Sequence, residues 1–372
     1  MIKILFLIPT LGQGGAEKVL VNLANNMDKN VFNITVKTLF DVGVNKQFLN
    51  KEVNYEYFFK KIFKGNSHVL KIFSPKFLYQ KIVKNKYDII VSYLEGPTAR
   101  IVAGCSDDAV LISWVHCTMH DEREFSIGFR NFSEACNLYK KFDQCVFVSD
   151  EVKNSFLRLC DRKSGNSVLY NTIESNIIIE KSNELIKSNI FFENEGLKLI
   201  AVGKIIPIKG FDRLARIHKK LIDEGYKIQT FILGIGEEKK ELEQYVLKEE
   251  IEDSFHFLGY HTNPYKYVKN SDLFICSSLS EGFSTAITEA LIVGTPIVST
   301  NVSGVKDLLG KNEYGLVTEN NEESLYEGIK YMLDNSDILQ YYKNKAKERG
   351  ESFKKEKTVH LVESMFIELV KK

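Results

Sequence analysis

Residues 272–291 read DLFICSSLSEGFSTAITEAL, and this stretch predicts a strand, a turn and the start of a helix in immediate succession. The apolar run at residues 273–276 is typical of a strand buried on both faces of a parallel sheet. The Glu-Gly pair at residues 281–282 forms the turn, and the small, hydroxylated residues after it predict a helix that begins near Phe283 or Ser284. A strand that runs directly into a helix is the repeating unit of an α/β fold.

Two glutamates flank the start of this helix, Glu281 in the turn and Glu289 about two turns into the helix. A rise of about 1.5 Å per residue separates them by roughly 10–12 Å, which is the scale of a nucleoside diphosphate sugar. The free N–H groups at the helix start attract phosphate, so one carboxylate can bind sugar hydroxyls and the other a ribose diol. Glutamate is also common on exposed helices, so the pair alone does not define a site.

The rest of the chain repeats the alternation of short apolar runs and longer periodic stretches. The strand candidates are residues 2–9, 32–39, 87–94, 109–116 and 144–150 in the first half, and 197–205, 228–236, 254–260, 272–278 and 295–301 in the second. A chain of 372 residues exceeds what one core usually organises. We therefore predict two doubly wound, parallel-sheet α/β domains, residues 1–173 and 197–350, joined by a linker at 174–196. A helix at 351–372 is expected to cross back to the N-terminal domain.

Composition excludes several classes of protein. The 50 Lys and Arg residues balance 49 Asp and Glu residues, so no global field favours a nucleic-acid partner. The six cysteines have no C-x-x-C pair and no matching His spacing, which argues against a disulfide framework and against a zinc site. The first strand lacks a cleavage site, and no apolar window approaches the roughly 18 residues of a membrane span. We expect a soluble, cytoplasmic protein that can lie at the inner face of the cell membrane.

Glycines and lysines follow several of the predicted strands, at the edge where doubly wound folds bind ligands. Lys204 and Lys209 are the strongest candidates, because two ammonium groups in one loop can hold a diphosphate as point charges. Lysines are also common on any surface, so these two can equally be solvated side chains. The glycine and aromatic candidates are Gly12, Gly14 and Gly15 after the first strand, Gly203 and Gly210 beside the lysines, Gly234 and Gly236 after the next strand, and Gly259 and Tyr260 after another.

The order of these motifs resembles glycosyltransferase family 4, whose members have the GT-B fold of two Rossmann-like domains that face each other across a cleft. The resemblance runs from residue 12 to residue 317. It rests on GGAEK (14–18), SWVHC (113–117), VLYNTIE (168–174), VGKIIPIKGFDRL (202–214), GIGEEKKEL (234–242), FLGY (257–260), SEGFSTAITEALIVGTPIVST (280–300), and SGVKDLL (303–309) with NEYGLV (312–317).

The resemblance implies a retaining transfer of a hexosyl or N-acetylhexosaminyl group from a nucleotide sugar, expected to be a UDP-sugar. Lys204 and Lys209 would neutralise the leaving diphosphate, and Glu281 would orient the donor sugar. His116 would sit by the sugar and steady developing positive charge or a ring hydroxyl, and Glu289 would bind the ribose. The implied donor-binding residues are Gly14, Gly15, Gly203, Gly234, Tyr260, Phe283, Ser284, Thr285 and Glu289.

No metal or other cofactor is expected, because cationic side chains and a helix N-terminus directed at the leaving group can stabilise the negative charge that develops on it. The sequence also contains no D-x-D motif. Four positions depart from the family pattern: Lys204 stands where Arg is usual, Thr172 where Gly is usual, and Ser303 and Asp307 where Gly and Glu are commoner. These departures concern loop geometry and donor identity rather than the class of reaction.

The acceptor side is less defined. Residues 55–87 contain eight lysines, one acid and many aromatic and aliphatic residues, which is typical of a segment that can contact an anionic membrane. The family implies a lipid-linked or oligosaccharide acceptor in capsule or O-antigen type polysaccharide synthesis. Three other functions stay open at this point: a GT-B sugar-nucleotide epimerase, a non-catalytic subunit that binds a sugar nucleotide, and a phosphorylase, which is less favoured because nothing in the sequence suggests a pyridoxal site.

Overall fold

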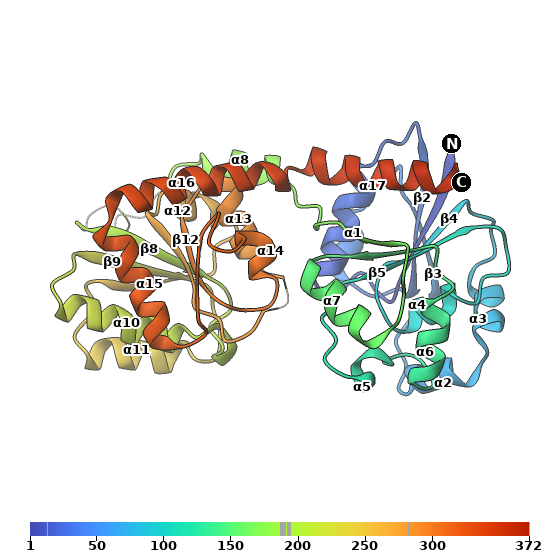
Figure 1. The fold of residues 1–372 in the computed structure, drawn as a ribbon, viewed down its shortest axis with the longest axis horizontal. Coiled ribbons are helices and arrows are strands. Elements are labelled where there is room, and N and C mark those ends of the chain that lie inside the picture. The colour runs from blue at the N-terminus through green and yellow to red at the C-terminus, as the bar shows by residue number, and fades with distance from the viewer. Residues whose placement is uncertain (13, 187–190, 192–194, 282, 372) are drawn as a thin grey trace. The chain divides into compact units, whose positions relative to one another are not determined.

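The computed structural model describes residues 1–12, 14–186, 191, 195–281 and 283–371. The chain divides into two compact units, residues 1–173 with 355–372, and residues 174–354 (Figure 1). Each unit is a parallel sheet covered by helices on both faces, so the predicted α/β fold with two Rossmann-like domains is confirmed.

The first unit has a seven-stranded sheet in the order β3-β2-β1-β4-β5-β6-β7, and every neighbouring pair is parallel. Its strands are β1 (Ile2–Ile8), β2 (Phe32–Phe40), β3 (Asn54–Phe59), β4 (Ile89–Ser92), β5 (Val110–Val115), β6 (Gln144–Phe147) and β7 (Asn166–Val168). Its helices are α1 (Gly15–Asn26), η1 (Val44–Phe48), α2 (Asn66–Ile72), α3 (Pro75–Ile82), α4 (Pro97–Val102), α5 (Glu122–Phe125), α6 (Phe132–Tyr139), α7 (Asp150–Leu159) and α17 (Lys355–Val370).

The last helix, α17, belongs to the first unit although it ends the chain. Phe366 is fully buried there, and its ring lies 6.1 Å from that of Phe6 in β1 and 6.4 Å from that of Phe32 in β2. Burial of aromatic rings from both ends of the sequence closes the core of this unit. The unit boundary falls at Lys355, after a short helix η3 (Glu351–Phe353).

The second unit has a six-stranded parallel sheet in the order β10-β9-β8-β11-β12-β13. Its strands are β8 (Leu197–Val202), β9 (Ile228–Leu233), β10 (Phe255–Gly259), β11 (Leu273–Cys276), β12 (Ile297–Thr300) and β13 (Leu316–Thr318). Its helices are α8 (Ser175–Ser182), η2 (Pro207–Lys209), α10 (Phe211–Asp223), α11 (Lys239–Lys248), α12 (Tyr265–Lys269), α13 (Thr285–Val293), α14 (Val305–Leu309), α15 (Glu322–Asp334) and α16 (Ser336–Gly350).

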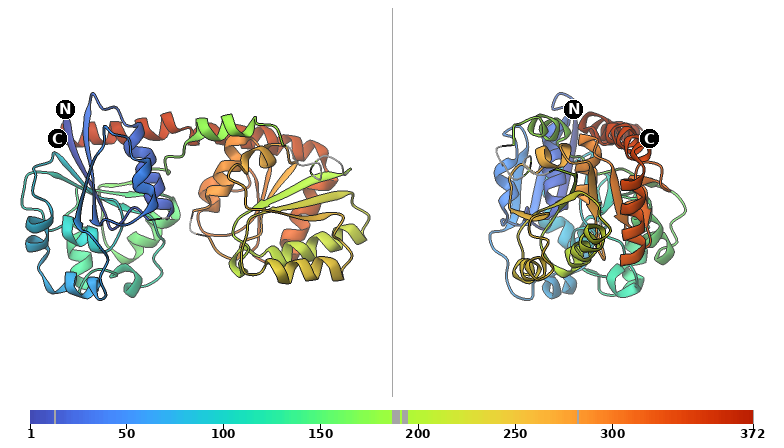
Figure 2. Two further views of the ribbon diagram at one scale, coloured as in Figure 1. Left: turned by 180° about the vertical axis from the view of Figure 1, so that it is seen from behind. Right: turned by 90° about the vertical axis from the view of Figure 1, so that its left-hand side faces the viewer.

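Helices α10 and α11 cover one face of the second sheet, and α12 and α13 cover the other (Figures 1 and 2). The strand order turns back between β8 and β11, which are adjacent and parallel. Doubly wound sheets bind ligands at such a switch point, beyond the carboxyl ends of the strands. The loops after β8 and β11 carry the predicted lysines and Glu281, so the fold places both at this point.

Several expectations about elements need correction. The predicted linker at 174–196 begins with helix α8, and residues 187–190 and 192–194 lie outside the described part of the chain. Helix α13 begins at Thr285 with Ser284 as its N-cap, one or two residues later than predicted. Strands β3, β7 and β13 were not predicted. Within the described residues, no helix is both long enough and apolar enough to cross a bilayer.

Candidate active site

Glu281 lies beyond the carboxyl end of β11, where the chain leaves the sheet toward α13. The Ser284 hydroxyl oxygen caps α13 by accepting a bond from the Ile287 N–H, at 3.4 Å. The Ser284 cap explains why the helix starts at Thr285, because serine favours the N-cap over the helix interior. Gly282 lies outside the described residues.

Lys209 reaches the same place from the loop after β8. It ends the short helix η2 and is followed by Gly210, whose backbone is left-handed with φ +60° and ψ 35°. A side chain at position 210 would overlap the Ser277 carbonyl oxygen, so glycine is required for the two loops to approach so closely. Lys209 is thereby placed beside Glu281.

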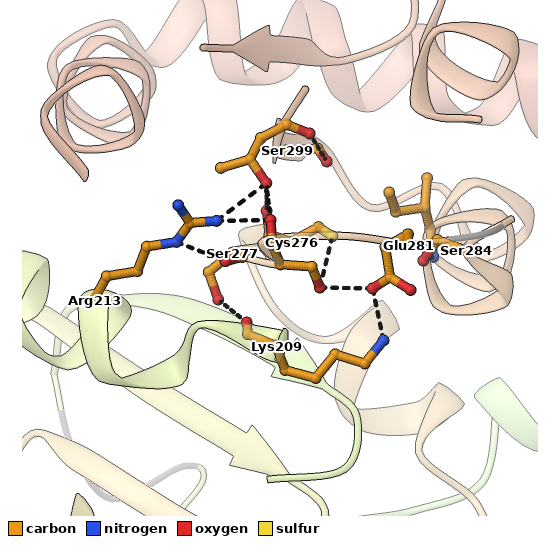
Figure 3. A network of polar contacts seen from close by, with 10 residues as sticks. Lys209, Arg213, Cys276, Ser277, Glu281, Ser284 and Ser299 are labelled. Atoms are coloured by element: carbon orange, nitrogen blue, oxygen red, sulfur yellow. Dashed lines mark hydrogen bonds and ion pairs between the residues drawn. The ribbon is translucent and has the colours of Figure 1, made fainter. Parts of the chain in front are cut away.

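Lys209 and Glu281 form an ion pair, with Nζ 2.6 Å from Oε1 (Figure 3). The Ser278 hydroxyl donates to the same carboxylate oxygen, also at 2.6 Å. Only 24% of the Lys209 side chain and 13% of the Glu281 side chain are exposed, so solvent screens this pair less than a surface pair. Because the ammonium group and the hydroxyl both donate to this oxygen, they fix the orientation of the carboxylate.

Most of the predicted donor residues line one cavity of about 320 Å³, which we call the lysine pocket. It is lined by Val202, Gly203, Lys204, Lys209, Glu281, Phe283, Ser284, Thr285, Ala286 and Glu289. Two lysines, two glutamates and the start of α13 therefore share one space. This combination can hold an anion beside groups that accept hydrogen bonds from hydroxyls.

A second cavity of about 340 Å³, the tyrosine pocket, adjoins the first, because Val202, Gly203 and Lys204 line both. Its other lining residues are Leu233, Gly234, Ile235, Tyr260, His261 and Pro264. Gly234 and Tyr260 were predicted, whereas Ile235, His261 and Pro264 were not. The Tyr260 ring is 70% exposed, so a flat ligand can stack on it.

Glu289 has a neighbour that the sequence did not point to. Tyr265, the first residue of α12, is hydrogen-bonded to the Glu289 carboxylate. Burial of the phenol, followed by the charge of Glu289 and this bond, raises the pKa of Tyr265. The phenol therefore stays protonated and donates to the carboxylate.

His116 and the glycines of the first loop lie in the other unit. His116 follows β5, its backbone N–H donates to the Glu95 carboxylate at 3.0 Å, and its ring lies 5.0 Å from that of Tyr93. Burial lowers the pKa of His116 to about 3, so the imidazole is neutral at pH 7. Among the described residues, none bonds to its buried Nε2. A neutral ring suits a hydrogen bond to a hydroxyl better than the stabilisation of positive charge.

Gly14 is the N-cap of α1, and Gly15 is its first residue. A side chain at position 14 would overlap the carboxylate of Glu17, whereas position 15 faces open space. Gln13, between them and Gly12, lies outside the described residues. Because the Glu17 carboxylate is the far end of a flexible side chain that can move aside, the structure gives no steric requirement for glycine at position 14 or at position 15.

Comparisons with known proteins show which proteins this chain is similar to. Residues 182–349 match the family model described as glycosyl transferases group 1. A Campylobacter jejuni protein named N-acetylgalactosamine-N,N'-diacetylbacillosaminyl-diphospho-undecaprenol 4-alpha-N-acetylgalactosaminyltransferase is 27% identical over 390 residues, which cover 96% of this chain and 97% of that protein. The capsular polysaccharide biosynthesis glycosyltransferase CapM of Staphylococcus aureus is 20% identical over 219 residues, which cover 56% of this chain and 54% of CapM.

Among solved structures, Anabaena Alr3699/HepE in complex with UDP superimposes with a TM-score of 0.77. The alignment covers 98% of this chain and 100% of the Anabaena chain at 18% identity. At that level of identity the likeness concerns the fold.

Proposed function

We propose that this chain, which has the GT-B fold and matches the group 1 glycosyl transferases over residues 182–349, is a retaining, metal-independent transferase that uses a UDP-sugar. It moves a hexosyl or N-acetylhexosaminyl group to a lipid-linked or oligosaccharide acceptor in cell-envelope polysaccharide synthesis. The observation that carries the proposal is the lysine pocket, where Lys209 and Glu281 pair at 2.6 Å beside Lys204 and Glu289.

The two adjoining pockets suit the two ends of a nucleotide sugar. The base lies in the tyrosine pocket against Tyr260, and the diphosphate lies in the lysine pocket between Lys204 and Lys209. Backbone amides of Ser284 and Thr285 point at the phosphates from the start of α13. Glu289, held by Tyr265, accepts hydrogen bonds from the ribose diol.

Departure of the diphosphate is the step that the lysines promote. As the bond between the anomeric carbon and the phosphate oxygen breaks, negative charge grows on the diphosphate, and Lys204 and Lys209 stabilise it. Glu281 binds a hydroxyl of the sugar and keeps the anomeric carbon in place. The acceptor oxygen forms its bond on the face that the diphosphate leaves, and the acceptor proton passes to the departing phosphate. No protein nucleophile is required.

The first unit contributes His116, Gly14 and Gly15 in this proposal. His116 hydrogen-bonds a sugar hydroxyl as a neutral imidazole, through the Nε2 that the described residues leave without a partner. The glycines Gly14 and Gly15 let the backbone at the start of α1 approach phosphate.

The proposal also includes a lipid-linked acceptor and contact with an anionic membrane. The name of the Campylobacter jejuni relative specifies a diphospho-undecaprenol acceptor, which supports a lipid-linked acceptor here. In residues 55–87, part of the apolar surface is core: Leu70, Leu78, Tyr79 and Ile82 are buried. Ile62, Ile72, Phe73 and Phe77 are exposed, by 53%, 70%, 42% and 41%. With Lys60, Lys61 and Lys64 on the same segment, they form the surface that contacts an anionic membrane.

A thermal-shift screen of UDP-, GDP- and ADP-sugars, each with its free nucleotide, tests the donor through ligand-linked stabilisation. Transfer is then assayed with the selected donor for wild type, Lys209→Ala and Glu281→Ala. We expect each substitution to lower transfer by about two orders of magnitude or more, because each removes a group that acts on the leaving diphosphate or the sugar.

Lys239→Ala serves as a control of equal charge change, because Lys239 forms an exposed pair with Glu243 on α11, outside both pockets. Wild-type rates in both site variants would contradict the assignment of the site. Conversion of the nucleotide sugar to its epimer without an acceptor would identify an epimerase instead, and donor binding without any turnover would identify a non-catalytic subunit.

A further inference from the structure

Arg213 lies behind the Lys209–Glu281 pair and is only 4% exposed. It lies in the first turn of α10, the helix that begins directly after Gly210, and is therefore close in sequence to the Lys209 loop. Figure 3 shows its guanidinium directed away from the Lys209 ammonium and toward Ser277, at the start of the segment that carries Glu281. Arg213 lines neither the lysine pocket nor the tyrosine pocket.

The guanidinium binds the backbone of this segment rather than a carboxylate. Its Nε donates to the Ser277 carbonyl at 2.7 Å, and a terminal nitrogen donates to the Ser278 carbonyl at 2.6 Å. Its other terminal nitrogen donates to Asn320 Oδ1 at 3.0 Å, and Asn320 Nδ2 donates to the Leu279 carbonyl at 2.8 Å. Three consecutive carbonyls, at residues 277–279, are therefore held by one arginine and one asparagine.

The same segment is also bonded to the Lys209 loop. The Ser277 hydroxyl donates to the Lys209 carbonyl at 2.9 Å, and the Leu279 N–H donates to the Ile208 carbonyl at 2.8 Å. Residues 277–279 are therefore hydrogen-bonded to Arg213 and Asn320 on one side and to the backbone of the Lys209 loop on the other. These bonds set the relative position of the Lys209 ammonium and the Glu281 carboxylate.

We propose that Arg213, together with Asn320, is a positioning residue for sugar transfer. The guanidinium and the Asn320 amide hold residues 277–279 so that Glu281 meets the donor sugar while Lys209 meets the diphosphate. This inference rests on the proposed function. Arginine suits the task because its planar fork donates in several fixed directions, whereas lysine keeps the charge but not this geometry.

Three variants separate positioning from mere support of the fold. Asn320→Ala is the mild test, because Asn320 is exposed and its removal leaves no buried void. Arg213→Lys keeps the buried charge and loses the fork. Arg216→Lys is the matched control, since Arg216 lies on the same helix but forms ion pairs with Asp212 and Glu322 and is 43% exposed.

Three quantities are measured for each variant: the affinity for UDP by titration calorimetry, and kcat and KM for UDP release from the nucleotide sugar that the screen selects. UDP lacks the sugar that Glu281 meets. We therefore expect Asn320→Ala to lower kcat about 10-fold and Arg213→Lys about 30-fold, with UDP affinity within about twofold of wild type for Asn320→Ala. Arg216→Lys should match wild type in all three quantities.

The inference is overturned if Asn320→Ala and Arg213→Lys keep wild-type kcat while Glu281→Ala is inactive. It is also overturned if Asn320→Ala loses UDP affinity by the same factor as kcat, because that pattern indicates a disturbed site as a whole. If Lys209→Ala and Glu281→Ala are themselves active, the proposed function fails instead, so the two failures are distinguishable.

Discussion

At the level of single residues, Lys209 and Glu281 are expected to have opposite effects on the affinity for UDP, because the two side chains form an ion pair. A diphosphate that binds Lys209 competes with the Glu281 carboxylate, which lies 2.6 Å from the ammonium. Replacement of Glu281 by glutamine removes this competition and keeps the size of the side chain. We therefore expect Glu281→Gln to bind UDP about 3- to 10-fold more tightly at low ionic strength, and to lose at least about 100-fold in turnover.

Titration calorimetry with UDP and the rate of UDP release check both halves of this prediction. Lys209→Met should weaken UDP binding, so the two variants move affinity in opposite directions. Weaker UDP binding in Glu281→Gln would show that the carboxylate supports the diphosphate site instead of competing for the ammonium.

The sequence was sufficient to bring the charged residues of the pocket together, because they follow β8 and β11 and parallel strands end at the same edge of the sheet. Ser278, Tyr265 and Arg213 were missed. Serine and arginine at such positions occur in many loops and helices, and their importance here follows from contacts with residues that are distant in sequence. Tyr265, for example, is important because it is hydrogen-bonded to Glu289, which is distant in sequence.

At the level of elements, the joint between η2 and α10 sets how closely two loops approach. Gly210 has a left-handed backbone, and a Cβ there would overlap the Ser277 carbonyl and press on Arg213. We expect Gly210→Ala to destabilise the protein by about 1–3 kcal/mol and to lower turnover, because the overlap separates Lys209 from Glu281.

Urea denaturation measures the loss of stability, and transfer assays measure the loss of turnover. Gly225→Ala is a suitable control, since Gly225 also has a positive φ, of +91°, but has open space around its Cβ position. A Gly210→Ala protein as active as wild type would mean that the loops tolerate a wider spacing.

The basic segment before α2 gives a prediction for the membrane surface. Lys60, Lys61 and Lys64 are exposed, so their replacement by glutamine should leave the fold intact. We expect the triple variant to sediment several-fold less with vesicles that contain about 30% phosphatidylglycerol, because each lysine near an anionic surface contributes about 1 kcal/mol. A triple glutamine variant at Lys239, Lys240 and Lys248 of α11 removes the same charge and should sediment like wild type. Equal sedimentation of all three proteins would exclude this surface as the contact.

The strands that the sequence revealed are all those that lie between two other strands, together with the edge strand β10. Strands β1, β4, β5 and β11 are predominantly apolar, because both of their faces are covered. The missed strands β3, β7 and β13 lie at the edges of the two sheets. Edge strands are less buried, so their sequences show no continuous apolar run; β7 and β13 have three residues each.

At the level of the whole molecule, the division into two units was visible in the sequence as two series of strands. The start of the second unit was not, because α8 has little amphipathic period. The sequence analysis expected the last helix to return to the first unit, but it did not identify the residues that α17 packs against. Phe366 contacts rings that are more than three hundred positions away in sequence, as Phe6 and Phe32 show. Such contacts leave no local pattern that a single sequence could reveal.

Histidines that burial keeps neutral occur in both units, and they make the stability of both units depend on pH in the same direction. His116 lies in the first unit, and His218 in the second, where its ring bonds to Thr230 and Ser254 at 2.8 Å. Burial lowers the pKa of each to about 3, with a further lowering of His218 by His256. Between about pH 6.5 and pH 3 the unfolded chain therefore binds more protons than the folded one, and stability falls as the pH falls.

The expected loss approaches about 1.4 kcal/mol per pH unit for each histidine below pH 6.5, and these two groups contribute no change above it. Urea midpoints at pH 7 and pH 5 measure this loss. Trp114, the only tryptophan and 2% exposed, reports on the first unit by fluorescence, while circular dichroism reports on both. His116→Asn should flatten the pH dependence of the fluorescence transition, whereas His360→Gln, at an exposed position on α17, should not. An unchanged fluorescence midpoint between pH 7 and pH 5 in wild type would mean that His116 is not buried as a neutral group.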